Sequence, residues 1–362
     1  MPAIEDIRVD LFRLPLPVAM KASAAGVMTA FDMVGVALTD AEGASGYGYT
    51  VLHEGQGGSV AACADGPLRA AIEGQDADRI EGLWRAMYKR THYAGRGGPV
   101  AFAMAAVDVA LWDLKARRLG QPLWKLLGGY DPKVRAYAGN IDLNFLVDQL
   151  LDGGMASVEA GFRSVKMRLG RPTLAEDIAR VEAMRNHLPD EIEMMADANE
   201  AWRVDQTMRA MHMLKEFDLV WLEEPVAPDD IAGQAHLRSL GLIPLALGEN
   251  LHTLAEFKTL FTAGAVDMPQ PDLTTCGGIT PFMKVARLAE AHGLPVMSHG
   301  AHDLHVHLLA ACPNNAYLEW HAFGLDKFMA DPLTVSDGFA TAPDRPGHGI
   351  DFDFDKLAAH RV

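Results

Sequence analysis

Three carboxylates recur at equal intervals in the second half of the chain, because Asp197, Glu223 and Glu249 are each separated from the next by 26 residues. Each follows a short apolar run of the kind that forms a buried strand. If these strands lie side by side, their ends bring the carboxylates together, and converging carboxylates repel one another unless a cation lies between them. Ligation by oxygen alone favours Mg²⁺, with Mn²⁺ as the alternative. A single acid at such a position is as readily a solvated surface charge, but three in register argue for a metal site.

Two further acids and a histidine end the next apolar runs, namely Asp272, His299 and Glu319. A carboxylate on a neighbouring strand end accepts a hydrogen bond from one imidazole nitrogen and leaves the other nitrogen free as an acid or base. We therefore expect Asp272 to orient His299 at the metal site. A lone histidine is more often structural, an interpretation that we give to His292, His302, His305 and His307.

Two cations alternate with apolar residues in another strand candidate, where Lys166 and Arg168 flank Met167. Side chains two residues apart on a strand point to the same face, so we expect both cations to face the opening that holds the carboxylates. A guanidinium keeps its proton at any ordinary pH, which makes Arg168 a poor candidate for a base.

The elements that must position these residues form a regular series after Gly129. Short apolar runs alternate with amphipathic helical stretches, as in a parallel (β/α)₈ barrel, whose functional side chains stand at the carboxyl ends of the strands. An open doubly wound sheet is the competing architecture, but the first βα turn lacks a glycine-rich dinucleotide fingerprint. The strand candidates are residues 134–139, 164–170, 193–199, 219–225, 244–250, 265–272, 295–300 and 316–321.

The chain on either side of this series has a different pattern. Residues 1–50 alternate between apolar and polar side chains and predict an antiparallel meander, whereas residues 58–128 have helical periodicity. The last 35 residues return to short strands and turns. We therefore predict an α+β capping domain over residues 1–128, a barrel over residues 129–328, and a C-terminal segment over residues 329–362 that completes the capping domain.

The composition excludes several classes of protein. The 362 residues include 49% hydrophobic and 22% charged side chains, a balance that allows a large core, and their formal net charge of −16 argues against a binder of nucleic acid or anionic membrane. No run reaches the roughly 18 apolar residues of a membrane span, and the first residues do not form a secretory signal. Three cysteines are too few for a disulfide framework. We expect a cytoplasmic protein that forms a homo-oligomer.

Taken together, these residues resemble the enolase superfamily and its mandelate racemase subgroup. The resemblance extends over the whole chain and includes two segments of the N-terminal part, the EGxxGxG pattern at 42–48 and the stretch 105–115. The other residues that carry it are Lys166-x-Arg168, Asp197, the motif 221–225, the motif 248–250, Asp272, the motif 277–280, His299 and Glu319.

This resemblance implies a (β/α)₇β barrel of the TIM type beneath an α+β cap, with Mg²⁺ held by Asp197, Glu223 and Glu249. It implies that the dyad of His299 and Asp272 acts as base or acid on a small carboxylate, a sugar acid. It also implies that Lys166 and Glu319 contact the substrate carboxylate, Glu319 as a protonated donor.

Within the subgroup the chain looks most like acid-sugar enzymes, namely the talarate/galactarate dehydratases and the anhydrogalactonate cycloisomerases. Segments 92–98 and 139–145 are similar to stretches of the latter. The chain departs from the subgroup at Arg168, where members that use this strand for catalysis usually carry a lysine as a base. We expect Arg168 to hold an anion or polarise the carboxylate instead; the alternative is that it marks a degraded site.

We expect His299 to remove the proton α to the carboxylate and to form an enediolate stabilised by the metal and Lys166. Epimerisation requires a second acid or base on the opposite face, which Arg168 does not provide. Loss of a β-hydroxyl as water, which yields a 2-keto-3-deoxy acid, is therefore our first hypothesis. Cycloisomerisation is the second and epimerisation a further alternative, and a non-catalytic sugar-acid binding protein is a remote one.

The residues that select the substrate are harder to assign. In this architecture cap loops read the substrate, and here these are the segments 21–29 and 49–53. Within them Lys21 and His53 are candidate contacts. Asn199, beside the predicted metal ligand Asp197, is a third.

Overall fold

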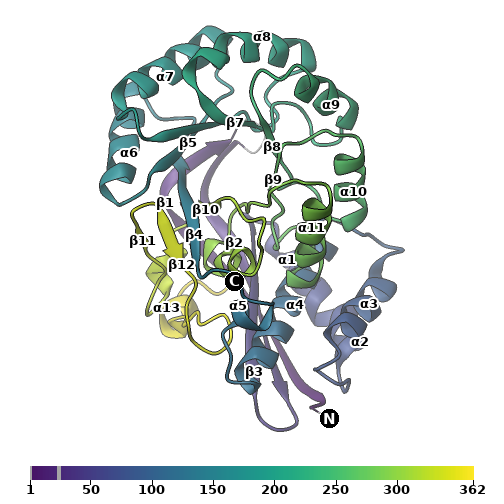
Figure 1. Ribbon diagram of the computed structural model, residues 1–362. Coiled ribbons are helices and arrows are strands. Elements are labelled where there is room, and N and C mark those ends of the chain that lie inside the picture. Colours follow the sequence, from purple (N-terminus) through teal and green to yellow (C-terminus); the bar gives the residue numbers. More distant parts are fainter. Residues whose placement is uncertain (1, 23–25) are drawn as a thin grey trace.

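The computed structural model describes residues 2–22 and 26–362 (Figure 1). The chain begins with an antiparallel three-stranded sheet in the order β1-β2-β3, which confirms the predicted meander. The register of the second strand pair places Phe31 opposite His53 at one end of the sheet. The bounds are Ile4–Ala22 for β1, Gly26–Asp40 for β2 and Ser45–His53 for β3.

Helices cover one face of this sheet. The longest, α4, packs on β3 through close contacts that only glycine allows: a Cβ on Gly48 would lie 2.2 Å from the carbonyl oxygen of Ala106, and one on Gly46 would lie 2.4 Å from that of Ala110. The EGxxGxG pattern therefore has a packing reason. The helices are α1 Gly57–Cys63, the π-helix Ala64–Leu68, α2 Arg69–Ile72, α3 Ile80–Thr91, α4 Pro99–Arg118 and α5 Leu123–Leu126.

The rest of the chain forms a parallel barrel with helices outside it (Figure 1). Neighbouring strands pair in sequence order from β4 to β9, and β10 pairs with β4, so the last strand closes on the first. The (β/α)₇β prediction is confirmed. The strands are β4 Lys133–Ile141, β5 Ser164–Arg168, β6 Glu193–Asp197, β7 Leu219–Glu223, β8 Leu245–Leu247, β9 Met268–Pro269 and β10 Leu318–Trp320.

The seventh strand differs from its prediction. Residues 295–300 run between β9 and β10 and form a single parallel bridge, from Val296 to Asn315, rather than a regular strand. Backbone hydrogen bonds from Met297 to Pro269 (2.9 Å) and from Ser298 to Tyr317 (3.2 Å) still tie this segment to its neighbours. The segment therefore fills the seventh place in the barrel, although its pairing is too short to count as a strand.

Helices follow the strands around the outside, and bulky side chains fill the inside. Trp221 packs edge-on against Tyr137 with ring centroids 5.2 Å apart, and Tyr317 packs against both rings. This plug makes the barrel a packed core rather than a pore. The helices are α6 Val147–Glu159, α7 Leu174–His187, α8 Val204–Leu214 with the 3₁₀ turn Lys215–Phe217, α9 Ile231–Ser239, α10 Leu254–Thr262, α11 Ile279–Ala291 and α12 His302–Ala310.

The C-terminal segment contacts both parts of the molecule. Its strand β12 pairs antiparallel with β4 of the barrel, whereas Phe352 and Phe354 pack edge-on against Tyr47 of the N-terminal sheet. The predicted domain boundaries at 128/129 and 328/329 remain a prediction. The elements are the 3₁₀ turn Leu325–Phe328, β11 Val335–Ser336, β12 Phe339–Thr341 and α13 Phe354–Ala358.

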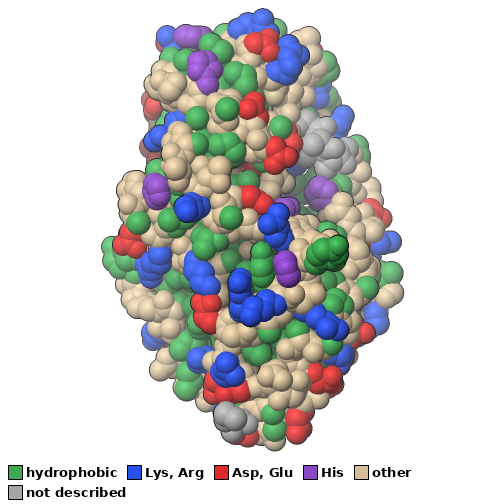
Figure 2. Space-filling view, turned by 90° about the vertical axis from the view of Figure 1, so that its right-hand side faces the viewer, with side chains coloured by type: hydrophobic (Ala, Val, Ile, Leu, Met, Phe, Trp, Pro, Cys, Tyr) green, Lys and Arg blue, Asp and Glu red, His purple; other side chains and the backbone are tan. Residues whose placement is uncertain are grey.

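Two features bear on the excluded classes. Among the helices of the described residues, none is both long and apolar enough to cross a lipid bilayer. Figure 2 shows acidic and basic side chains interspersed over one face of the molecule, in a chain whose formal net charge is −16.

Candidate metal centre and active site

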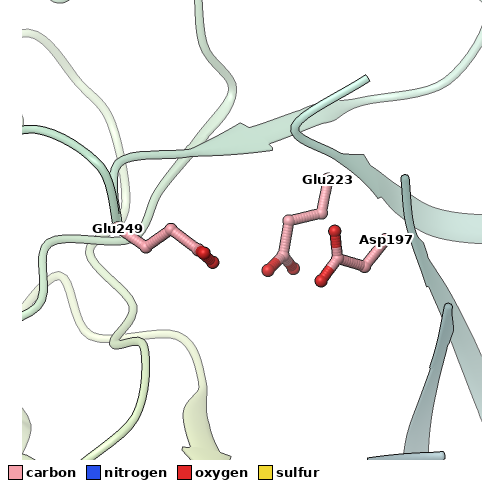
Figure 3. A group of neighbouring side chains, drawn as sticks. All are labelled: Asp197, Glu223 and Glu249. Carbon is pink, nitrogen blue, oxygen red and sulfur yellow. The ribbon is translucent and has the colours of Figure 1, made fainter. Parts of the chain in front are cut away.

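The three equally spaced acids meet at one point, as predicted (Figure 3). Asp197 and Glu223 are the last residues of β6 and β7 and lie side by side in the register of these strands, and Glu249 follows β8 by two residues. Each offers a carboxylate oxygen, and the three oxygens lie within 4.8 Å of one another. Oxygen donors at this spacing suit a divalent cation such as Mg²⁺.

The electrostatics of the triad also fit a cation. Burial, together with the charges of Asp197, Glu319 and Glu249, raises the pKa of Glu223 to about 8 although Lys166 opposes this shift. Burial and neighbouring acids likewise raise the pKa of Glu249. Carboxylates that resist ionisation because they repel one another are stabilised when a cation joins them.

Hydrogen bonds hold the ligand side chains in place. The second carboxylate oxygen of Glu223 accepts hydrogen bonds from Trp221 Nε1 and Gln270 Nε2, both at 2.9 Å. Asn199 donates its side-chain amide to Asp197 Oδ2 at 3.1 Å. Asn199, a predicted substrate contact, thus touches a metal-ligand candidate, and its contact with substrate remains a prediction. The orientation of such ligands through their neighbours is typical of metal sites.

Lys166 lies in the middle of the acidic cluster. Its Nζ is 2.6 Å from Glu223 Oε1, 2.8 Å from Glu319 Oε1 and 3.4 Å from Asp197 Oδ2. Burial alone would lower the pKa of Lys166, but these carboxylates raise it well above its ordinary value. The carboxylates around Lys166 therefore favour its protonated form in this arrangement, and its contact with a substrate carboxylate remains a prediction.

Glu319 corrects one expectation. We expected a protonated donor, but one of its oxygens pairs with Lys166 and the other accepts the backbone N–H of Gly300 at 2.8 Å. Burial opposes ionisation, yet the charges of Lys166 and His299 hold the pKa of Glu319 well below its usual range. Glu319 is thus ionised in this arrangement and holds the ammonium of Lys166, whereas its contact with the substrate carboxylate remains a prediction.

His299 and Asp272 lie together as the sequence predicted. His299 Nδ1 is 3.0 Å from Asp272 Oδ2, and the other ring nitrogen, Nε2, is 3.3 Å from Glu249 Oε2. Burial lowers the pKa of His299, but Glu249, Glu319 and Asp272 together raise it well above its ordinary value. The Nε2 atom therefore lies beside the metal-ligand candidate Glu249.

Arg168 has few partners for a buried guanidinium. It is 8% exposed, its nearest acid is Asp142 at 3.7 Å, and neither Nε nor Nη1 has a hydrogen-bond partner among the described residues. Asp142 Oδ2 also accepts the backbone N–H of Lys21 at 2.7 Å, which ties the end of β1 to the barrel. A guanidinium with unused donors is suited to bind an anionic or polar group.

The structure places two predicted cap residues, His53 and Lys21, near the site. His53 ends β3, and burial together with the charges of His299 and Arg168 lowers its pKa, so it lies within electrostatic range of the site. Lys21 reaches the site region through its backbone. Residues 23–25 of the predicted cap loop lie outside the described residues. The roles of His53 and Lys21 as substrate contacts remain predictions.

Several residues of the site were not predicted. Glu224 is buried next to the triad and accepts a hydrogen bond from Asn250 at 2.8 Å. His321 stands near His299, with ring centroids 5.8 Å apart. A signal existed for His321, because it follows Glu319 by two residues and so shares its face of the strand. His305, interpreted as structural, accepts the N–H of Leu273 and contacts the carbonyl oxygen of Gly300.

Curated relatives with known activities cover almost the whole chain. The chain is 48% identical over 354 residues to a 3,6-anhydro-alpha-L-galactonate cycloisomerase of Streptomyces coelicolor, covering 98% of each protein. It is 35% identical to an L-talarate/galactarate dehydratase of Salmonella typhimurium, covering 98% of this chain and 90% of that protein. Acid-sugar dehydratases and cycloisomerases are thus the enzymes to which this chain is similar.

Two solved structures share the fold of this chain and contain bound magnesium. A racemase from Streptomyces coelicolor with bound magnesium superimposes with a TM-score of 0.97 at 47% identity, covering 99% of this chain and all of the other. An L-talarate dehydratase from Polaromonas, in complex with Mg and L-glucarate, superimposes with a TM-score of 0.92 at 36% identity, covering 100% of this chain and 98% of the other.

Two family descriptions match along the sequence. Residues 6–128 match the N-terminal domain of the mandelate racemase / muconate lactonizing enzyme family, and residues 153–356 match the enolase C-terminal domain-like family. Both matches agree with the cap, the barrel and the converging acids described above. The chain therefore belongs to the mandelate racemase / muconate lactonizing enzyme family of the enolase superfamily.

Proposed function

We propose that this protein is a Mg²⁺-dependent cycloisomerase that opens the ring of a 3,6-anhydro sugar acid by removing the proton α to its carboxylate. The observation that carries the choice is the 48% identity to a 3,6-anhydro-alpha-L-galactonate cycloisomerase over 98% of both chains. Dehydration of an open-chain acid sugar, the first hypothesis from the sequence, becomes the second candidate. It is supported by the lower identity of 35% to the talarate/galactarate dehydratase.

Asp197, Glu223 and Glu249 would hold the magnesium ion. When bound, the ion supplies positive charge to the substrate carboxylate and so makes the neighbouring C–H bond more acidic. Lys166 adds a second positive charge beside the same carboxylate, since its ammonium is kept protonated by the acids around it. Removal of the α-proton places extra negative charge on the carboxylate, which these fixed charges stabilise.

His299 is the base of this proposal. The acids around it raise its pKa, and a magnesium ion held by Glu249 would offset part of that negative charge and so free Nε2 to accept a proton. Its Nε2 accepts the proton from C2, while Nδ1 donates to Asp272 Oδ2, which fixes the tautomer and stabilises the imidazolium that forms. The guanidinium of Arg168 holds a polar part of the substrate. With one competent base, the enzyme processes one configuration at C2 and does not racemise it.

The ring-opening step balances without another reactant. The electron pair of the C2–H bond forms the C2–C3 double bond, and the C3–O bond of the anhydro ring breaks with its electrons on oxygen. That oxygen takes up a proton and becomes a hydroxyl group. The resulting enol gains a proton at C3 and becomes a 2-keto-3-deoxy acid, an isomer of the substrate. Dehydration follows the same course, except that the oxygen leaves as water.

Product analysis tests the proposal. The purified enzyme with Mg²⁺ is incubated with 3,6-anhydro-L-galactonate, L-talarate or galactarate, and the products are identified by mass spectrometry and proton NMR, with His299→Asn as the inactive control. We expect a product of unchanged mass from the anhydro acid. Preferential loss of water from the open-chain acids would instead favour the dehydratase, and the absence of any product would refute both.

A further inference from the structure

One buried histidine of the barrel mouth has no role in the steps above. His321 directly follows β10 and stands two residues beyond Glu319, so both side chains point into the barrel mouth. Arg168 stands in the same way two residues beyond Lys166 on β5. Lys166 and Glu319 therefore form a lower layer beside the metal-ligand candidates, whereas Arg168 and His321 form an upper layer nearer the cap.

Aromatic packing fixes the ring of His321. Its centroid lies 3.8 Å from that of Phe323 at an interplanar angle of 22°, and Phe323 in turn packs on Phe31 of β2 at 5.0 Å. The ring of His299 is 5.8 Å away at 74°. The imidazole is thus held between the cap and the proposed base, with little freedom to turn toward another partner.

His321 has an unmet hydrogen-bonding need. It is 6% exposed, and its buried Nδ1 has no hydrogen-bond partner among the described residues. His302 and His307 share an unpartnered Nδ1, whereas both ring nitrogens of the nearby His305 have backbone partners. A buried polar atom without a partner is destabilising, because it has lost its hydrogen bonds to water and gained none. Burial lowers the pKa of His321 well below its ordinary value, with Glu319 opposing this shift, so the ring is neutral and carries one donor and one acceptor nitrogen.

We propose that His321 is a substrate-contact residue that hydrogen-bonds the oxygen on C3 of the bound sugar acid, the oxygen that leaves in the reaction. This inference rests on the proposed function. If the carboxylate lies in the lower layer and C2 faces His299, the next atoms of the substrate extend into the upper layer. The first oxygen beyond C2 is the one on C3, and His321 is a neutral polar side chain whose ring lies beside that of His299 at that level.

Three variants separate this role from a structural one. His321→Leu removes the hydrogen bond but retains a side chain that packs on Phe323, and His321→Asn retains a short polar group near the position of Nδ1. The matched control is His302→Leu, because His302 is also a buried histidine stacked on an aromatic ring, that of Trp320 at 4.1 Å, on the opposite side of the same strand. Thermal unfolding checks that each variant is folded.

The experiment compares two substrates with the Mg²⁺-loaded enzyme. Turnover is measured with 3,6-anhydro-L-galactonate, and exchange of the α-hydrogen in D₂O is measured with a 3-deoxy sugar acid, which has no oxygen on C3. We expect His321→Leu to lose about 10- to 100-fold in kcat/KM on the anhydro acid, as for a lost buried hydrogen bond. Its exchange of the 3-deoxy acid should stay within about threefold of wild type. His321→Asn should recover part of the loss, and His302→Leu should resemble wild type.

Two results would overturn the inference. An equal loss with both substrates in His321→Leu would indicate a structural role, and no loss with either would show that His321 does not touch the reacting part of the substrate. If the wild-type enzyme neither turns over the anhydro acid nor exchanges the 3-deoxy acid, the proposed function fails, and this inference fails with it. The wild-type arm therefore distinguishes the two failures.

Discussion

Replacing Asp272 by asparagine tests how much of the catalysis depends on the hydrogen bond behind His299. The two side chains meet at 3.0 Å, and the carboxylate is 3% exposed. Its other oxygen accepts the backbone N–H of Thr274 at 2.7 Å, so the group is rigid. Asparagine has the same shape, and the change removes the negative charge while the fold is retained.

The size of the effect follows from the charge that forms on His299 in the transition state. At 3.0 Å, Coulomb's law gives about 1.4 kcal/mol between unit charges in a water-like medium and about 5.5 kcal/mol at an effective dielectric constant of about 20. The amide of asparagine recovers part of this energy if its oxygen faces Nδ1. We therefore expect a loss of about 3 kcal/mol, which lowers kcat about 100-fold.

The assay follows deuterium exchange and product formation by proton NMR in D₂O at saturating Mg²⁺. Asp267→Asn is the matched control, since Asp267 lies near the opposite end of the same strand and pairs with Arg238 at 2.7 Å, outside the site. We expect this control to remain within about threefold of wild type. If Asp272→Asn exchanged the α-hydrogen as fast as Asp267→Asn, the orienting role of Asp272 would be refuted.

Three other changes have defined outcomes. Asp197→Asn should weaken Mg²⁺ binding at least about 100-fold by calorimetry and abolish turnover, with an unchanged circular dichroism spectrum; full activity of the variant or of chelator-treated wild type would contradict the metal site. Arg168→Lys keeps the charge but loses the planar fork, so kcat/KM should fall about tenfold, and racemisation of either C2 epimer by wild type would show that a second base exists. Burial raises the pKa of Asp108 to about 7 although Thr280 donates two hydrogen bonds to it. Because the unfolded chain ionises this acid near pH 4 and the folded one only near pH 7, its ionisation lowers stability as pH rises, by about 2–3 kcal/mol between pH 5 and 8. Asp108→Asn should lose that part of the pH dependence in urea unfolding, and an identical pH profile in the variant would refute the assignment.

The residues that could be predicted from sequence are those that the repeating βα unit places. Equal intervals set Asp197, Glu223 and Glu249 at the same level of the barrel, because each repeat adds one strand and one helix before the chain returns to the same edge. Asp272 and His299 end the next two apolar runs and reach the same site, although the intervals between them are not equal. The pattern fails at residues 295–300, where side chains suited to a strand occur but the backbone forms only one bridge.

Tertiary contacts explain what the sequence could not predict. The ionised state of Glu319 depends on Lys166, which is far from it in the sequence and close to it in space. Arg168 forms few hydrogen bonds, and Asp142 accepts the backbone N–H of Lys21. Both features likewise arise only when the cap and the barrel meet. His321 lies two residues after Glu319, so strand alternation places it on the same face. Whether a histidine is structural or functional depends on its hydrogen-bond partners, which the sequence does not contain.

The choice between ring opening and dehydration could not be predicted because both reactions begin with the same proton transfer. The acids, Lys166 and His299 serve that shared step, and the substrate itself supplies the oxygen that leaves. Only the similarity to a cycloisomerase separates the two reactions, and this is why ring opening ranks first.

The central claim is that the enzyme breaks the C–H bond next to the carboxylate of a sugar acid. Its most direct test uses 3,6-anhydro-L-galactonate labelled with deuterium at C2 and the Mg²⁺-loaded enzyme in ordinary water. Our account predicts that the wild-type enzyme releases the deuterium from C2 to the solvent and reacts more slowly with the labelled substrate than with the unlabelled one. His299→Asn should release no deuterium and form no product. A product formed at the same rate with the deuterium still on C2 would contradict the account.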